Sequence, residues 1–120
     1  MKKFRVSGNS MYPILKNGDV FLARRRKKDE IPDTGAIVVA EYGEKLIVKQ
    51  FFPAADEGGG EIKAFLLGFN RKNSRDSRNF GALPLGAVRY IRTAGCGSFR
   101  EMFRGLRRSI LSALKKGRTV

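Results

Sequence analysis

A single serine in a turn-forming stretch is the first residue that could do chemistry. The stretch reads Gly-Asn-Ser-Met-Tyr-Pro-Ile-Leu-Lys-Asn-Gly-Asp over residues 8–19, so Ser10 stands between turn formers and apolar residues. A hydroxyl in such a turn can be lifted out of a strand's hydrogen-bond ladder and act as a nucleophile. An ordinary polar turn before a strand has a similar composition, so the residues alone leave both interpretations open.

Lys49 is the second candidate, because it interrupts an apolar, strand-like segment at residues 45–52. Side chains alternate along a strand, which predicts that Lys49 shares a face with Ile47 and Phe51. Apolar surroundings disfavour the ammonium form, so they lower the pKa of a lysine and produce an amine that can accept a proton from serine. The alternative is an edge-strand lysine whose stem lies on apolar surface while its ammonium reaches water.

A third polar segment follows the lysine strand. Residues 68–81 read Gly-Phe-Asn-Arg-Lys-Asn-Ser-Arg-Asp-Ser-Arg-Asn-Phe-Gly, a composition typical of a loop whose side chains bond their own backbone. Taken alone, such a loop is usually structural.

The three segments together resemble the boxes of the type I signal peptidase family of serine proteases, in the same order. Residues 8–19 resemble the box G-x-S-M-x-P-T-L-x-x-G-D, with Ile14 in place of Thr. Residues 68–81 resemble the box G-D-N-R-x-N-S-x-D-S-R-x-W/F-G. The resemblance implies that Ser10 is the nucleophile, that its backbone N–H is an oxyanion donor, and that Lys49 is the general base.

The resemblance also assigns supporting roles within the third box. Ser74 is expected to hydrogen-bond the lysine amine and orient it. Asp76 and Arg78 are expected to form an ion pair that fixes the loop, and Asn70 is a further supporting residue.

Two positions depart from the family pattern together. The family has Arg and Asp, which pair with each other, where this chain has Gln50 and Phe69. Losing one partner of an ion pair strands a charge, whereas losing both can be nearly neutral. We therefore interpret the two departures as one compensated change.

The composition excludes several other catalytic mechanisms and metal sites. The chain has no histidine, which excludes a Ser-His-Asp triad, a Cys-His dyad and a histidine-ligated metal site. Its single cysteine, Cys96, excludes an internal disulfide and a multi-cysteine metal site. We therefore expect no metal and no cofactor.

The formal net charge of +14 implies an anionic neighbour, such as a membrane surface or a nucleic acid. The charge run at 24–30 is predicted to be a solvated loop, and specific nucleic-acid binding is not expected because no aromatic is interleaved for base stacking. The first residues lack the apolar run of a signal peptide, and no segment approaches the roughly 20 apolar residues of a spanning helix. A cytoplasmic or peripheral membrane location is expected.

Short apolar segments separated by turns position these residues. Strands are predicted at 20–23, 36–42, 45–52, 61–67 and 86–92, with residues 36–42 apolar enough to be buried on both faces. The absence of a βαβ rhythm predicts a small, strongly bent, mainly β domain. The resemblance implies the sheet or barrel of the signal peptidase and LexA catalytic domains.

The last part of the chain has a different pattern. Apolar residues recur at three- and four-residue spacings among many cations, which predicts a basic amphipathic helix over 98–118. We therefore divide the chain into a catalytic domain, 1–95, and a helical segment, 96–120. The helix could pack on the domain or lie on an anionic membrane, and the sequence leaves both possibilities open. The apolar positions are Phe99, Met102, Phe103, Leu106, Ile110 and Leu114.

The predicted function is that of a serine endopeptidase that removes an N-terminal leader or signal-type peptide from a precursor protein. The chain resembles most closely the compact branch called nickel-type superoxide dismutase maturation proteases. One alternative is a catalytically inactive basic domain that binds an anionic membrane or nucleic acid. Another is a self-cleaving repressor domain of the LexA type. Such domains share the serine–lysine chemistry but lack the polar box that residues 68–81 resemble.

Overall fold

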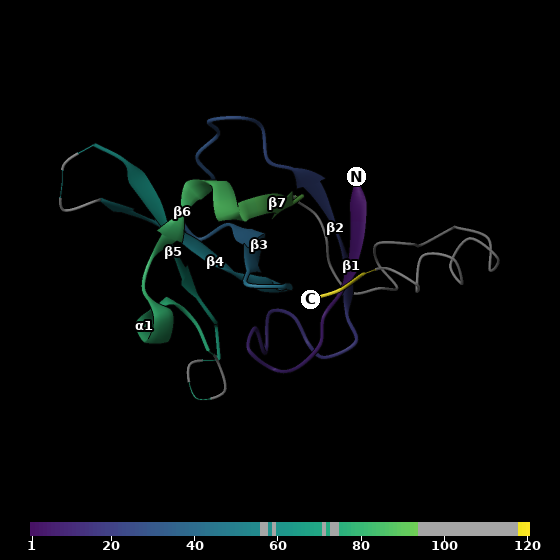
Figure 1. Ribbon diagram of the computed structural model, residues 1–120. Helices are drawn as coiled ribbons and strands as arrows, with labels where there is room; N and C mark the ends of the chain where they lie inside the picture. Colours follow the sequence, from purple (N-terminus) through teal and green to yellow (C-terminus); the bar gives the residue numbers. More distant parts are fainter. Residues whose placement is uncertain (56–57, 59, 71, 73–74, 94–117) are drawn as a thin grey trace.

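A curled, eight-stranded sheet dominates the computed structural model, which describes residues 1–55, 58, 60–70, 72, 75–93 and 118–120 (Figure 1). The mainly β fold class predicted from the sequence is confirmed, and the sheet forms a half-barrel. A short helix, α1, spans Ser77–Phe80, and a 3-10 turn, η2, spans Leu85–Ala87. The strands are β1 (Lys2–Arg5), β2 (Val20–Arg25), β3 (Ile37–Tyr42), β4 (Lys45–Ala55), β5 (Ile62–Leu67), β6 (Leu83–Pro84), β7 (Val88–Arg92) and β8 (Arg118–Thr119).

The strands follow the order β6-β5-β4-β3-β7-β2-β1-β8 across the sheet. Neighbouring strands are antiparallel except β1 and β8, which run parallel. The serine turn after β1 and helix α1 lie at the lower end of Figure 1, whereas the connection between β2 and β3 lies at the opposite end. The first and third sequence boxes are therefore at the same end of the molecule.

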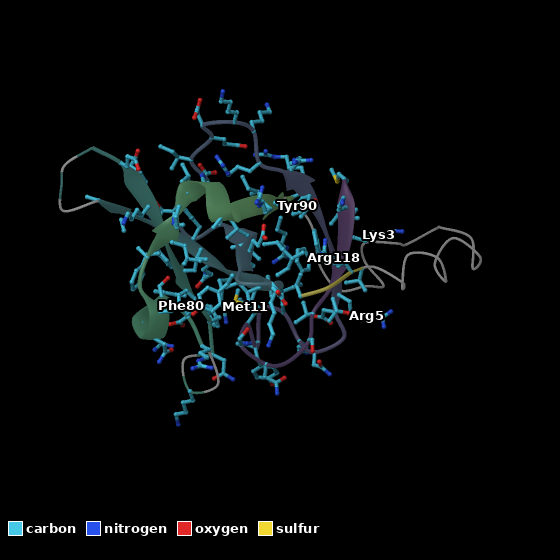
Figure 2. All side chains as sticks on the ribbon, viewed as in Figure 1. Lys3, Arg5, Met11, Phe80, Tyr90 and Arg118 are labelled. Atoms are coloured by element: carbon cyan, nitrogen blue, oxygen red, sulfur yellow. The ribbon has the colours of Figure 1, made fainter. Side chains whose placement is uncertain are left out.

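The sheet has a buried cluster on each face. The central strand β3 contributes to both, because Val39 belongs to one cluster and Val38 and Ala40 belong to the other. All three side chains are fully buried, as the apolar run predicted. In Figure 2, Met11 enters the interior, whereas Lys3 and Arg5 extend outward from β1.

Three parts of the chain differ from the prediction. Residues 2–5, to which no strand was assigned, form β1, since Phe4 alternates with polar residues and its side chain is buried. Strand β4 continues to Ala55 because its second half pairs with β5. The charge run is not simply a solvated loop: Arg24 and Arg25 lie in β2, and Arg24 forms a double hydrogen bond with Glu30.

Most of the predicted C-terminal helix lies outside the described residues, which resume at residue 118. There, Arg118 and Thr119 form strand β8 instead of continuing a helix, because the backbone of this segment pairs with β1. None of the helices in the described residues has the length and apolarity of a membrane span.

Candidate active site

The turn that carries Ser10 is closed by backbone hydrogen bonds at its base. Val6 N–H donates to Asp19 O, and Gly18 N–H donates to Val6 O, both at 2.8 Å. Gly8 has a φ of 90°, a left-handed conformation that glycine adopts without strain, and its N–H donates to Asn17 Oδ1 at 2.9 Å. These bonds hold both ends of the turn, which fixes the position of Ser10.

Two apolar side chains anchor the same turn in the interior. Met11 is fully buried and Leu15 is 1% exposed, and Leu15 N–H donates to Met11 O at 2.9 Å. Burying each such side chain contributes about 1.5–3 kcal/mol. Tyr12 and Ile14, between them, remain exposed. The turn is therefore anchored in the interior at Met11 and at Leu15, and the residues between these two positions face outward.

Lys49 lies in the middle of β4, opposite Val38 of β3, and is only 5% exposed. Ile47 and Phe51 pack in the cluster that contains Val38, as the predicted alternation requires. Burial lowers the pKa of Lys49 below its ordinary value; the negative charge of Asp76 partly opposes this shift, and the positive charge of Arg78 adds to it. The surroundings of Lys49 therefore shift its protonation equilibrium toward the neutral amine, relative to an exposed lysine.

Ser10 and Lys49 line the same cavity, whose volume is about 210 Å³. Within the described part of the chain, no hydrogen bond occupies the Ser10 N–H, so this donor is available to an oxyanion. The remaining lining residues are Ser7, Ile47, Val48, Arg75 and Val120.

A larger hollow of about 720 Å³ lies elsewhere, next to β5 and η2. Its lining includes Ile31, Ile62 and Leu85, and the described residues that line it include no serine, threonine or cysteine. Volume alone would favour this hollow, whereas the presence of a nucleophile and a base favours the smaller cavity.

The described residues of the third box contain a fully buried carboxylate, that of Asp76. Asp76 accepts hydrogen bonds from Gly68 N–H at 2.9 Å and from Arg78 N–H at 3.0 Å, and it caps helix α1. It also forms an ion pair with Arg78 at 3.0 Å. The carboxylate raises the pKa of Arg78 through this hydrogen-bonded contact. The expected Asp76–Arg78 pair is thus present.

The loop is joined directly to the serine turn. Asn70 N–H donates to the carbonyl oxygen of Ser10 at 2.8 Å. The sequence indicated Asn70 as a supporting residue, and in the structure its backbone makes this contact. The hydrogen bond connects the first and third boxes and restrains the residue that carries the hydroxyl.

Several site residues had no assigned role in the sequence analysis. Ser77 is buried and its hydroxyl accepts the Leu66 N–H at 2.8 Å, which ties the loop to β5. Ser7 precedes the first box and Arg75 lies within the third, so their places in the sequence could have drawn attention to them. No sequence signal pointed to Val120. Ser74 lies outside the described residues.

The two departing positions, Gln50 and Phe69, line one hollow of about 200 Å³ together with Phe52, Leu67 and Gly68. Their proximity is what the interpretation of a compensated change requires. Among the described residues, no group of three or more metal-ligating side chains is found.

Residues 2–68 match the family described as peptidase S24-like. This match covers more than half of the chain, including the serine turn and the lysine strand. The chain belongs to the peptidase S24-like family. The family indicates a serine-type peptidase within the S24/LexA-like superfamily. No curated protein matches the chain.

The matched region of this S24-like chain ends at Gly68, where the third box begins. The match therefore includes the elements that carry Ser10 and Lys49, and the loop around Asp76 lies beyond the matched residues. The superfamily is the one to which the LexA-type alternative belongs.

Proposed function

We propose that this chain is a serine endopeptidase in which Ser10 and Lys49 form a catalytic dyad. The observation that carries the proposal is that both residues line one cavity and that burial lowers the pKa of the lysine. A base whose pKa lies closer to the working pH is present more often in its neutral form. Membership of a peptidase family supports the same reaction class.

The reaction proceeds in two steps. The neutral Lys49 amine takes the proton of the Ser10 hydroxyl, and the oxygen attacks the carbonyl carbon of the scissile peptide bond. The peptide C–N bond breaks, the leaving amine takes the proton from the Lys49 ammonium, and an acyl-enzyme remains. Lys49 then deprotonates a water molecule, whose oxygen attacks the ester carbonyl. The bond between the Ser10 oxygen and the acyl carbon breaks, the Ser10 oxygen takes the proton back from the Lys49 ammonium, and the second product leaves with a new carboxyl group.

The other assigned groups position the dyad or stabilise charge. The Ser10 N–H donates to the oxyanion of each tetrahedral intermediate. Asp76 and Arg78 hold the loop that carries Asn70, whose N–H bonds the Ser10 carbonyl. In this proposal Ser74 orients the Lys49 amine, a role that rests on the sequence resemblance.

The proposed substrate is a precursor protein with an N-terminal leader, with nickel superoxide dismutase as the first candidate. The sequence boxes support this assignment. Peripheral contact with an anionic membrane is a second part of the proposal, and the net charge of +14 supports it. We do not propose a specific nucleic-acid partner.

The dyad is tested by cleavage of a leader peptide from a nickel superoxide dismutase precursor. Ser10→Ala and Lys49→Ala should each lower kcat/KM by about 10³-fold or more, because nucleophile and base act as one unit. Thr34→Ala and Lys28→Ala are matched controls at exposed positions away from the cavity and should retain wild-type activity. Equal cleavage by the wild type and both dyad variants would exclude the proposed mechanism.

A further inference from the structure

Strand β8 covers the outer edge of β1, next to the candidate site. Arg118 pairs with Phe4 and Thr119 pairs with Arg5 in a parallel ladder. The short yellow segment passes the lower end of β1 in Figure 1, and the label of Arg118 stands near the same strand in Figure 2. Without β8, the edge of β1 would present unpaired backbone groups, which is the kind of edge that an extended peptide can join.

Val120 continues this ladder into the cavity that Ser10 and Lys49 line. Its N–H donates to Arg5 O, and its carbonyl oxygen accepts the Ser7 N–H, both at 2.8 Å. These two bonds place Val120 beside Val6. The Val120 side chain is 9% exposed and packs in the cluster that contains Phe4, Met11 and Val48.

The opposite wall of the cavity comes from the first half of β4. Ile47, Val48 and Lys49 line the cavity, and the observed pairing between β4 and β5 begins only at Gln50. Within the described residues, the strand pairing of the Lys45–Val48 part of β4 is with β3. The cavity lies between the end of β1 and this stretch, where an extended chain fits.

We propose that residues 118–120 block the peptide-binding edge of the site from within the same chain, and that this segment must leave β1 before a substrate peptide can bind. The proposal rests on the proposed peptidase function. Residues 118–120 occupy the β1 edge that a substrate would use, and the Val120 side chain lines the cavity of the dyad. The segment and a substrate peptide therefore cannot bind at the same time.

Few contacts hold residues 118–120 on the domain. Strand β8 has two residues, and both of their side chains are exposed. Val120 is the only buried side chain among residues 118–120. A blocker held by one apolar contact and a few backbone bonds can be displaced, and it lowers the apparent affinity for substrate by the fraction of molecules in which the edge is free.

The first experiment replaces the buried contact and compares peptide cleavage. Val120→Asn introduces a polar amide into the apolar cluster and should release the segment. We expect kcat/KM for the leader peptide to rise about tenfold through a lower KM with kcat unchanged, because the blocker competes only with substrate binding. Thr119→Asn makes the same chemical change at the exposed neighbouring position and should leave KM at the wild-type value. A KM for Val120→Asn equal to or above that of the wild type would overturn the proposal.

A peptide with the sequence Gly-Arg-Thr-Val, corresponding to residues 117–120, gives a second activity measurement. It should inhibit Val120→Asn competitively and inhibit the wild type less, because the wild-type edge is already occupied. Equal inhibition of both proteins, or none of either, would contradict the proposal.

A third measurement needs no catalysis and applies even if Val120→Asn does not fold. Amide hydrogen exchange is followed in the full-length Ser10→Ala protein with and without the leader peptide at saturating concentration. Substrate should speed exchange at the Val120 N–H, which loses Arg5 O. Unchanged protection of Val120 in the presence of bound leader peptide would overturn the blocking role. By contrast, cleavage that survives Ser10→Ala would refute the dyad without testing the blocker, so the two failures are distinguishable.

Discussion

Two arginine–carboxylate pairs hold the two polar connections of this domain, and their surroundings differ. Asp76 and Arg78 meet at 3.0 Å, with the carboxylate fully buried. Arg24 and Glu30 meet at 2.6 Å, with both side chains partly exposed. The exposed pair is shorter, yet a short distance between solvated charges adds little stability, because water screens the attraction and the long side chains lose freedom.

The difference between the pairs concerns their partners more than their distance. The Asp76 carboxylate also receives the backbone N–H groups of Gly68 and Arg78, and its charge acts on the pKa of Lys49. Glu30 receives the Lys27 N–H, within its own connection. The buried pair therefore links a loop, a helix cap and the candidate base, whereas the exposed pair organises only its own turn.

The largest expected effect comes from removing the buried carboxylate. Asp76→Ala leaves the buried Gly68 N–H without its acceptor and removes the cap of α1, which should lower the free energy of unfolding by about 2–4 kcal/mol. Urea unfolding followed by circular dichroism measures this change. Asp33→Ala, a matched change at an exposed aspartate, should shift the free energy of unfolding by less than about 0.5 kcal/mol. Similar losses for the two variants would show that the buried carboxylate has no special structural role.

The sequence predicted the local contacts around the candidate site better than the contacts between segments that are distant in the chain. The resemblance of residues 68–81 to the signal peptidase box implied that Asp76 and Arg78 pair, and this contact is local, because the two residues are two apart in the chain. The alternation of residues 45–52 likewise predicted the neighbours of Lys49. The Asn70–Ser10 bond and the pairing of β8 with β1 depend on how distant segments meet, and no local pattern encodes such contacts.

The next effect concerns pH, and it tests whether Lys49 is as strongly desolvated as its burial indicates. Its pKa in the folded state lies below its ordinary value of about 10.5. Between these two values the unfolded chain binds more protons, so stability should rise with pH by up to about 1.4 kcal/mol per unit. Lys49→Met removes this titration and should be more stable than the wild type at neutral pH, with the difference shrinking as pH rises.

Activity provides a second readout of the same titration. Below the folded-state pKa, kcat/KM should increase about tenfold per pH unit, because the neutral amine is the base. Above that pKa the amine is already neutral, so kcat/KM should be flat where the stability difference changes. A profile that is also flat below that range would separate the titration of Lys49 from catalysis.

The smallest effect is expected at the exposed pair. The hydrogen bonds from Arg24 lower the pKa of Glu30 to about 2, so this pair contributes above the ordinary carboxyl pKa near 4.5 and its contribution is lost as pH falls toward 2. Glu30→Gln should therefore lower the melting temperature slightly at pH 7 and low salt. The same substitution should have no measurable effect in 1 M salt, where surface charges are screened. A decrease as large as that of Asp76→Ala, persisting in salt, would mean that distance outweighs burial in ranking the two pairs.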